Sequence, residues 1–172
     1  RSAVLMAGLL VIASQTKLPL SLYEDGASAG LNLISDRYSY LLGDLETGTE
    51  GAKARLTPQW IGPSPPDANV KIVSRRGVDL LPIDLSTVAG QERLLAYIWP
   101  DQSERLARTA AALEVACADP PRIVRGDAAN WVENEIRIAP EAGIARVLMH
   151  SIAFQYFSAD AQKRITERVE RV

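Results

Sequence analysis

The segment Glu24-Asp25-Gly26-Ala27-Ser28-Ala29-Gly30 separates two apolar stretches of the chain, residues 18–23 and residues 31–34. The first stretch has the composition of a buried strand, and the second predicts the first turn of a helix. The small residues between them favour a tight turn. A strand, a tight turn and a helix in this order open a Rossmann-like α/β unit.

The small side chains of this turn leave its backbone open to a ligand, which can then approach the N–H groups closely. The predicted helix would add unpaired N–H donors and a partial positive charge at its N-terminus. A carboxylate or a phosphate would be stabilised there. The same small residues would also let the helix pack close to the sheet, and the turn alone does not distinguish the two interpretations.

Strand-like and helix-like segments alternate along the rest of the chain. Further strands are expected at residues 70–73, 123–124 and 146–152. Residues 37–42 and 55–61 predict a hairpin, and the prolines of residues 62–68 predict a loop. We therefore predict a single α/β domain over residues 1–172, with a mainly parallel, Rossmann-like sheet covered on both faces and an inserted β-hairpin and loop at 37–68.

Three helices are predicted outside the turn. The first covers residues 1–14, the second is opened by Pro100 and a capping box of Asp101 and Glu104, and the third is capped by Ser158. Helical spacing predicts the buried faces of the last two, which contain Leu106, Ala110, Leu113 and Cys117, and Ile165, Val169 and Val172.

Composition excludes several classes of function. Lys and Arg number 19 and Asp and Glu number 21 among the 172 residues, a formal net charge of −2 that argues against a dedicated nucleic-acid-binding protein. The lone Cys117 and the lone His150 exclude an internal disulfide and any multi-Cys or two-His metal site. The longest apolar run, residues 3–13, is shorter than the roughly 20 residues of a membrane span. We expect a cytoplasmic protein with no membrane contact.

Five separate segments of the chain, in the same order, resemble a bacterial family known as domain of unknown function 2332. They are Glu24-x-Gly-Ala-Ser-Ala-Gly-Leu-Asn-Leu, Arg75-Arg76-Gly77-Val78-Asp79 with Pro82, Trp99-Pro100-Asp101-Gln102, Arg125-Gly126-Asp127-Ala128, and His150-Ser151 with Gln155-Tyr156. Members of that family usually carry an aliphatic residue in place of Asp25. The resemblance implies a fold like that of class I methyltransferases.

The spacing of the glycines favours one cofactor over another. The turn resembles the acid-x-Gly-x-Gly-x-Gly motif of S-adenosylmethionine-dependent methyltransferases at Glu24, Gly26 and Gly30, and departs from it at Ser28. A dinucleotide motif would need glycines at Ser28 and Leu31. S-adenosylmethionine is therefore favoured over NAD.

The resemblance to methyltransferases implies a role for each polar residue at a strand end. Glu24 would position the methionine end of the cofactor, and Asp79 would accept hydrogen bonds from the ribose hydroxyls. Asp44 is a rival for that role because it follows the turn at the spacing of a ribose-binding acid. Asp127 would bind the adenine amino group, or cap a helix. His150 would be the catalytic base, or a partly buried structural histidine.

The resemblance implies an S-adenosylmethionine-dependent methyltransferase acting on an unknown acceptor. The alternative is a nucleoside- or cofactor-binding protein that keeps the fold and has no chemistry; Ser28 and the lack of an acceptor-binding motif favour it. The sequence does not indicate an oligomeric state. A complete sheet of the methyltransferase type has more strands than the roughly four predicted here. We therefore expect flanking segments to complete the sheet edge and part of the acceptor pocket.

Overall fold

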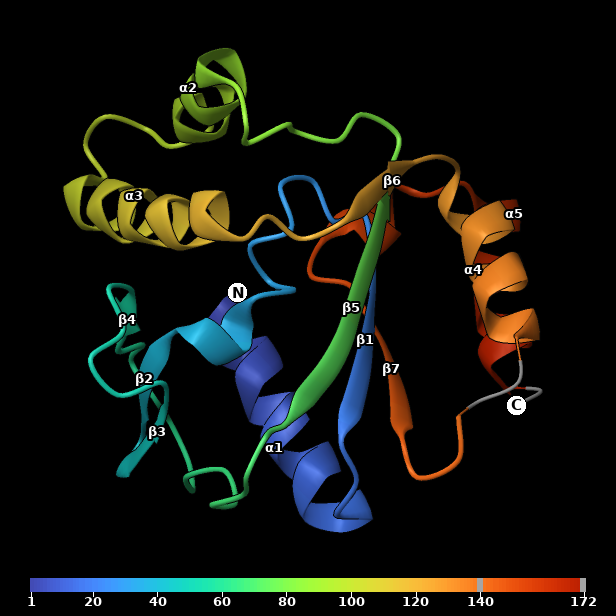
Figure 1. Ribbon diagram of the computed structural model, residues 1–172, viewed down its shortest axis with the longest axis horizontal. Coiled ribbons are helices and arrows are strands. Elements are labelled where there is room, and N and C mark those ends of the chain that lie inside the picture. Colours follow the sequence, from blue (N-terminus) through green and yellow to red (C-terminus); the bar gives the residue numbers. More distant parts are fainter. Residues whose placement is uncertain (139–140, 171–172) are drawn as a thin grey trace.

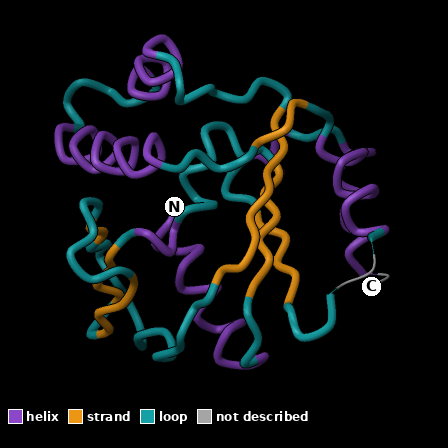
Figure 2. Tube along the Cα trace, viewed as in Figure 1, coloured by secondary structure: helices purple, strands orange, loops and turns teal. Residues whose placement is uncertain are grey.

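A central parallel sheet organises the protein. The computed structural model describes residues 1–138 and 141–170, and its main sheet has the strand order β6-β5-β1-β7. The strands are β1 (Leu20–Asp25), β5 (Ile72–Asp79), β6 (Ile123–Arg125) and β7 (Ala145–Met149), and every neighbouring pair is parallel. Figures 1 and 2 show the sheet between two groups of helices. The prediction of an α/β fold with a mainly parallel sheet is confirmed.

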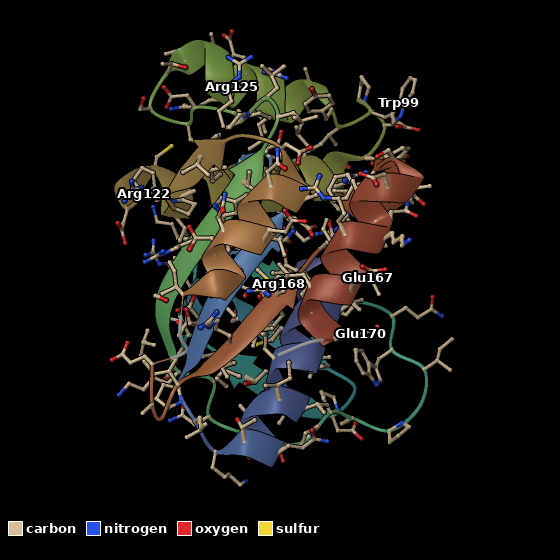
Figure 3. All side chains as sticks on the ribbon, turned by 90° about the vertical axis from the view of Figure 1, so that its right-hand side faces the viewer. Trp99, Arg122, Arg125, Glu167, Arg168 and Glu170 are labelled. Atoms are coloured by element: carbon tan, nitrogen blue, oxygen red, sulfur yellow. The ribbon has the colours of Figure 1, made fainter. Side chains whose placement is uncertain are left out.

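Helices lie on both sides of this sheet. One side carries α1 (Ser2–Thr16) and, beyond the strand ends, α2 (Val88–Ala96) and α3 (Ser103–Ala118). The other side carries α4 (Ala128–Arg137) and α5 (Ala159–Glu170), which lie against each other (Figure 3). None of the helices in the described residues is long and apolar enough to span a membrane.

The residues of β1 alternate between these two helical layers. Leu20 and Leu22 belong to the large core that α1 shares, whereas Tyr23 contacts Trp131 of α4 with 6.0 Å between ring centroids. Because strand side chains alternate between faces, Glu24 follows Leu22 toward α1, and Asp25 follows Tyr23 toward α4 and α5. The two neighbouring carboxyl groups therefore face different surroundings.

The chain adds strands to the sheet first on one side of β1 and then on the other. After β1 the chain forms β5 and then β6 on one side, and it returns to form β7 on the other side. In open parallel sheets, ligands bind beyond the carboxyl ends of the strands at such a reversal point. The order of the strands thus marks the space beyond the ends of β1 and β7 as the place to look for a site.

The small-residue turn is not followed by a helix, and that prediction is wrong. Residues 31–34 form consecutive turns that lead into the short 3-10 helix η1 (Ser35–Arg37). The hydroxyl of Tyr38 donates to the carbonyl of Leu31 at 2.9 Å, and that of Tyr40 donates to the carbonyl of Ser35 at 2.7 Å. The Leu31 carbonyl thus accepts from a side chain, and the Ser35 carbonyl accepts from the Tyr40 hydroxyl as well as from the Tyr38 N–H of the 3-10 turn, in place of the hydrogen bonds of an α-helix.

The inserted hairpin exists, with a different partner strand from the one predicted. β2 (Ser39–Leu42) pairs antiparallel with β3 (Leu45–Gly48) through the two-residue connection Gly43-Asp44, where Gly43 has φ +66°. β4 (Arg55–Leu56), from the segment predicted as the partner, pairs parallel with the other edge of β2. Because the two-residue connection with Gly43 allows a tight turn, β3, which follows β2 directly in the chain, becomes the hairpin partner.

Several predicted boundaries also shift. β5 begins at Ile72 and continues to Asp79, α2 was not predicted, and β7 ends at Met149. α3 begins at Ser103 after Gln102, without a side-chain cap, so the predicted capping box of Asp101 and Glu104 is not formed.

The helix faces were predicted in part. The buried residues of α3 are Ala112, Leu113 and Ala116, and Cys117 is exposed because it lies at the end of the helix. In α5, the Ser158 hydroxyl accepts from the Ala161 N–H, as predicted, and Ile165 is buried. Val169 is 45% exposed, contrary to the prediction, and Val172 lies outside the described residues.

Candidate functional site

A cavity of about 830 Å³ lies at the carboxyl edge of the sheet, beside the reversal point between β1 and β7. Residues 26–29 of the small-residue turn form one part of its wall, and Ser151 and Ile152, which follow β7, form another. The remaining wall comes from the start of α1, from Leu31, Asn32 and Tyr38, from β4 and the residue before it, and from α2, α3 and their connection. The cavity lies within the usual size range of small-molecule sites, roughly 300–1,000 Å³.

The turn lines the cavity at Gly26 and Ser28, whereas Gly30 faces elsewhere. A Cβ atom on Gly30 would lie 2.5 Å from a side-chain atom of Pro121, and one on Gly26 would lie 2.1 Å from the Cβ of Ala153. Gly26 and Ser28 also have left-handed backbone, at φ +65° and +54°. The packing interpretation of the small residues therefore has direct support. The anion site at a helix N-terminus does not, because no helix begins there.

Asp79 holds the turn in place. Its two carboxylate oxygens accept hydrogen bonds from the backbone N–H groups of Ser28 and Leu81, both at 2.8 Å. Asp44 lies in the hairpin connection, and its own N–H donates to the hydroxyl of Ser64. Neither Asp79 nor Asp44 lines the cavity, but Asp79 contacts a residue that does.

Glu24 is buried next to the cavity wall. It is 1% exposed, and burial raises the pKa of its carboxyl group to about 8. The side-chain amide of Asn32 donates to its Oε1 at 2.7 Å, and Ser2 donates to the same amide group at 2.8 Å. Asn32 and Ser2 both line the cavity. Among the described residues, Oε2 of Glu24 has no hydrogen-bond partner.

Asp25 and His150 form a pair on the opposite face of the sheet. Asp25 is fully buried, neither carboxylate oxygen has a hydrogen-bond partner in the described part of the chain, and burial raises its pKa to about 6 against the opposing effect of His150. The Nδ1 atom of His150 lies 3.5 Å from Oδ1 of Asp25, an ion-pair distance. The imidazole stacks on Phe154 with 4.6 Å between ring centroids.

His150 lies beside the cavity rather than in its wall. Met149 and Val147 belong to the core shared with α1, whereas Leu148 packs against the smaller core of α4 and α5. Because side chains two residues apart in a strand point to the same face, His150 faces α4 and α5 as Leu148 does. Ser151 is the first residue after β7 that lines the cavity. The structure thus places His150 with Asp25.

Asp127 caps a helix. Its carboxylate accepts a hydrogen bond from the N–H of Asn130 at 2.9 Å at the start of α4. It is not among the residues that line the cavity. The capping interpretation therefore has direct support, and the carboxylate stays partly accessible to solvent.

The sequence analysis missed the basic part of the cavity wall, which consists of Arg1, Arg105 and Arg108. Arg105 and Arg108 are three residues apart, a spacing that places both on one face of a helix. That spacing was visible in the sequence. Their position over the turn was not, because α2 and α3 belong to a long connection between β5 and β6.

The family described as "uncharacterized protein conserved in bacteria (DUF2332)" matches residues 1–172. No curated protein and no solved structure matches the chain.

Proposed function

The chain belongs to this family of uncharacterized bacterial proteins, and we propose that it is an S-adenosylmethionine-dependent methyltransferase with its site at the cavity between β1 and β7. One observation carries the proposal. With the strand order β6-β5-β1-β7, the cavity lies beyond the carboxyl end of β1, where the turn of small residues forms part of its wall and Glu24 contacts Asn32 of that wall.

The buried carboxyl group of Glu24 supports a cofactor with a positively charged end. With a pKa of about 8, the group is mostly protonated at neutral pH when nothing neutralises it. Its Oε2 atom lacks a partner in the described residues, and its Oε1 atom is oriented by Asn32 of the cavity wall. An ammonium or sulfonium group nearby would favour the ionised form of Glu24.

Two aspartates extend this site in the proposal. Asp79 accepts one hydrogen bond on each oxygen, so each oxygen keeps a lone pair for a ribose hydroxyl. Asp127 accepts a hydrogen bond on Oδ1 and, among the described residues, none on its other oxygen, which in this proposal accepts from the adenine amino group. Gly26 and Ser28 contribute backbone to the wall.

When bound, the cofactor supplies an electrophilic methyl group to a nucleophilic acceptor. The chain's own contribution is then chiefly the alignment of the two reactants in the cavity. His150 is the one histidine of the chain, and the next residue, Ser151, lines the cavity. In this proposal His150 is the general base, with its Nδ1 atom facing Asp25.

Calorimetric titration of the chain with S-adenosylmethionine, S-adenosylhomocysteine and NAD tests the proposal. We expect the first two to bind and NAD not to bind. Glu24→Gln should weaken S-adenosylhomocysteine binding by about tenfold, or about 1.4 kcal/mol, and Glu46→Gln, on the exposed hairpin, should leave it unchanged. Binding of NAD alone, or equal affinities for the two variants, would contradict the proposal. Binding without methyl transfer to any acceptor would favour the non-catalytic alternative.

A further inference from the structure

The wall of the cavity carries positive charge without matching negative charge. Arg105 and Arg108 of α3 and Arg1 at the start of α1 line it, and no Asp or Glu among the described residues does. In Figure 1 the N-terminus lies below the level of α3, near the C-terminal end of that helix, and Arg1 lines the same cavity as the two arginines of α3.

The existing contacts leave most donors of these arginines unused. Arg105 donates to the neutral side chain of Gln102 at 2.9 Å. Arg108 contacts Glu104 at 3.3 Å across one turn of α3, and the Glu104 side chain is 88% exposed, so water screens the pair. A guanidinium group has five N–H donors. The side chains of Arg1 and Arg105 have no carboxylate within 4.0 Å in the described part of the chain.

Two arginines elsewhere in the protein, Arg75 and Arg164, are paired more closely. Arg75 binds both oxygens of Asp36 at 3.0 Å, and Arg164 binds both oxygens of Glu133 at 2.9 and 2.7 Å. Each of these two guanidinium groups is held by both oxygens of one carboxylate. At the cavity the single carboxylate contact within the described residues is the exposed Glu104 on Arg108, which leaves most guanidinium donors available to a ligand.

We propose that Arg1, Arg105 and Arg108 bind an anionic group, a phosphate or a carboxylate, on the small molecule that receives the methyl group. This assignment to the acceptor rests on the proposed function. The neighbouring wall contains Leu94, Ile98 and Ala112, with the ring of Tyr97 beside them. The acceptor is therefore a small-molecule acid with an apolar portion, held by its charged end against α3.

Binding of inorganic phosphate and of benzoate to the whole chain tests the proposal. The probes are followed by the NMR signals of the arginine Nε–H groups and by calorimetry. We expect the signals of Arg105 and Arg108 to shift with at least one probe. The stronger of the two probes identifies the phosphate or carboxylate as the preferred group.

The variant Arg105→Gln/Arg108→Gln should bind the preferred probe about tenfold more weakly, which corresponds to about 1.4 kcal/mol. Lys163→Gln on α5, an exposed lysine away from the cavity, is the control for lost positive charge and should bind as the unaltered chain does. Thermal unfolding of each variant checks that the fold is kept.

The outcomes separate this inference from the methyltransferase proposal. Weaker binding of the probe with unchanged binding of S-adenosylhomocysteine supports the inference. Unchanged binding of the probe in the double variant overturns it, and so does an equal loss of S-adenosylhomocysteine binding, because the arginines would then serve the cofactor. If the arginines bind the probe but the chain does not bind S-adenosylhomocysteine, the anion site is supported and the methyltransferase proposal is refuted.

Discussion

Glu24 and Asp25 are neighbours at the end of β1, yet their carboxyl groups titrate in different ranges. Both side chains are almost completely buried, and burial raises the pKa to about 8 for Glu24 and to about 6 for Asp25. Asp25 faces His150, which lowers its pKa, whereas the charges of Asp25 and Asp79 raise that of Glu24 further. The two faces of one strand end therefore offer a mostly neutral acid toward the cavity and a mostly ionised one toward α4 and α5.

Gly26 lies in the turn that follows Glu24 and Asp25. Gly26→Val should cause the largest loss in the free energy of unfolding. A Cβ atom there would lie 2.1 Å from the Cβ of Ala153, and φ is +65°. Left-handed backbone costs about 1–2 kcal/mol and overpacking about 1–3 kcal/mol, so we expect a loss of about 3 kcal/mol in the free energy of unfolding, measured with urea. Gly51→Val, at φ +68° with open space around it, should lose the backbone part alone. Equal losses in both variants would show that Ala153 gives way.

The sequence predicted the parts of this strand end that depend on local chemistry. β1 follows from its apolar composition, and elsewhere in the chain the cap at Ser158 follows from the usual preference for short polar residues at helix starts, whereas for Asp127 capping was one of two open interpretations. The absent helix after the turn could not be predicted this way. There the carbonyls of Leu31 and Ser35 accept hydrogen bonds from the hydroxyls of Tyr38 and Tyr40, and the positions of these two rings depend on the fold of the chain that follows.

The sequence indicates the surroundings of the cavity only in part. Residues 26–29 of the small-residue turn line the cavity and Asp79 binds the turn, but Gly30 faces Pro121 instead. Arg105 reaches the cavity from α3, more than seventy positions further along the chain than the turn. Sequence spacing carries no information on such a contact. It places Arg105 and Arg108 on one helix face but does not show what that face meets.

The neutral character of Glu24 predicts how stability depends on pH. Because its pKa is raised from an ordinary value of 4.5 to about 8, the folded state binds the proton more tightly. Its contribution to stability is then greatest at low pH and is lost as the pH rises from about 4.5 to about 8, at up to about 1.4 kcal/mol per pH unit. Relative to the unaltered chain, Glu24→Gln should gain about 4 kcal/mol in stability at pH 8 and less than about 1 kcal/mol at pH 5.

Urea unfolding at several pH values measures this difference. Glu46→Gln, on the exposed hairpin, should show no pH-dependent difference from the unaltered chain. A constant difference between Glu24→Gln and the unaltered chain from pH 5 to pH 8 would mean that Glu24 is ionised throughout, and that the cavity face does not hold a neutral acid.

The variant Asp79→Ala tests whether the small-residue turn beside the cavity needs the hydrogen bonds of Asp79. Asp79→Ala removes two hydrogen bonds from backbone N–H groups to a carboxylate, and we expect a loss of about 2 kcal/mol in the free energy of unfolding. Asp44→Ala should change stability by less than about 0.5 kcal/mol because Asp44 lies in an exposed turn. If the protein binds a nucleoside, the same order should hold for its affinity. The reverse order would make Asp44 the residue that matters and the hairpin part of the site.

His150→Gln should have the smallest effect on the protein. It changes the surroundings of Asp25, on the face of β1 that points toward α4 and α5. The positive charge that His150 carries when protonated lowers the pKa of Asp25, so its removal should raise that pKa above about 6, by less than about one unit. The range over which Asp25 loses its stabilising proton then extends to higher pH. The carboxyl ¹³C signal of Asp25, followed by NMR as the pH is changed, measures the shift. Phe154→Leu removes the stacked ring and keeps the imidazole, so it should leave the pKa of Asp25 near its original value. An equal shift in both variants would mean that the packing around Asp25, rather than the charge of His150, separates it from Glu24.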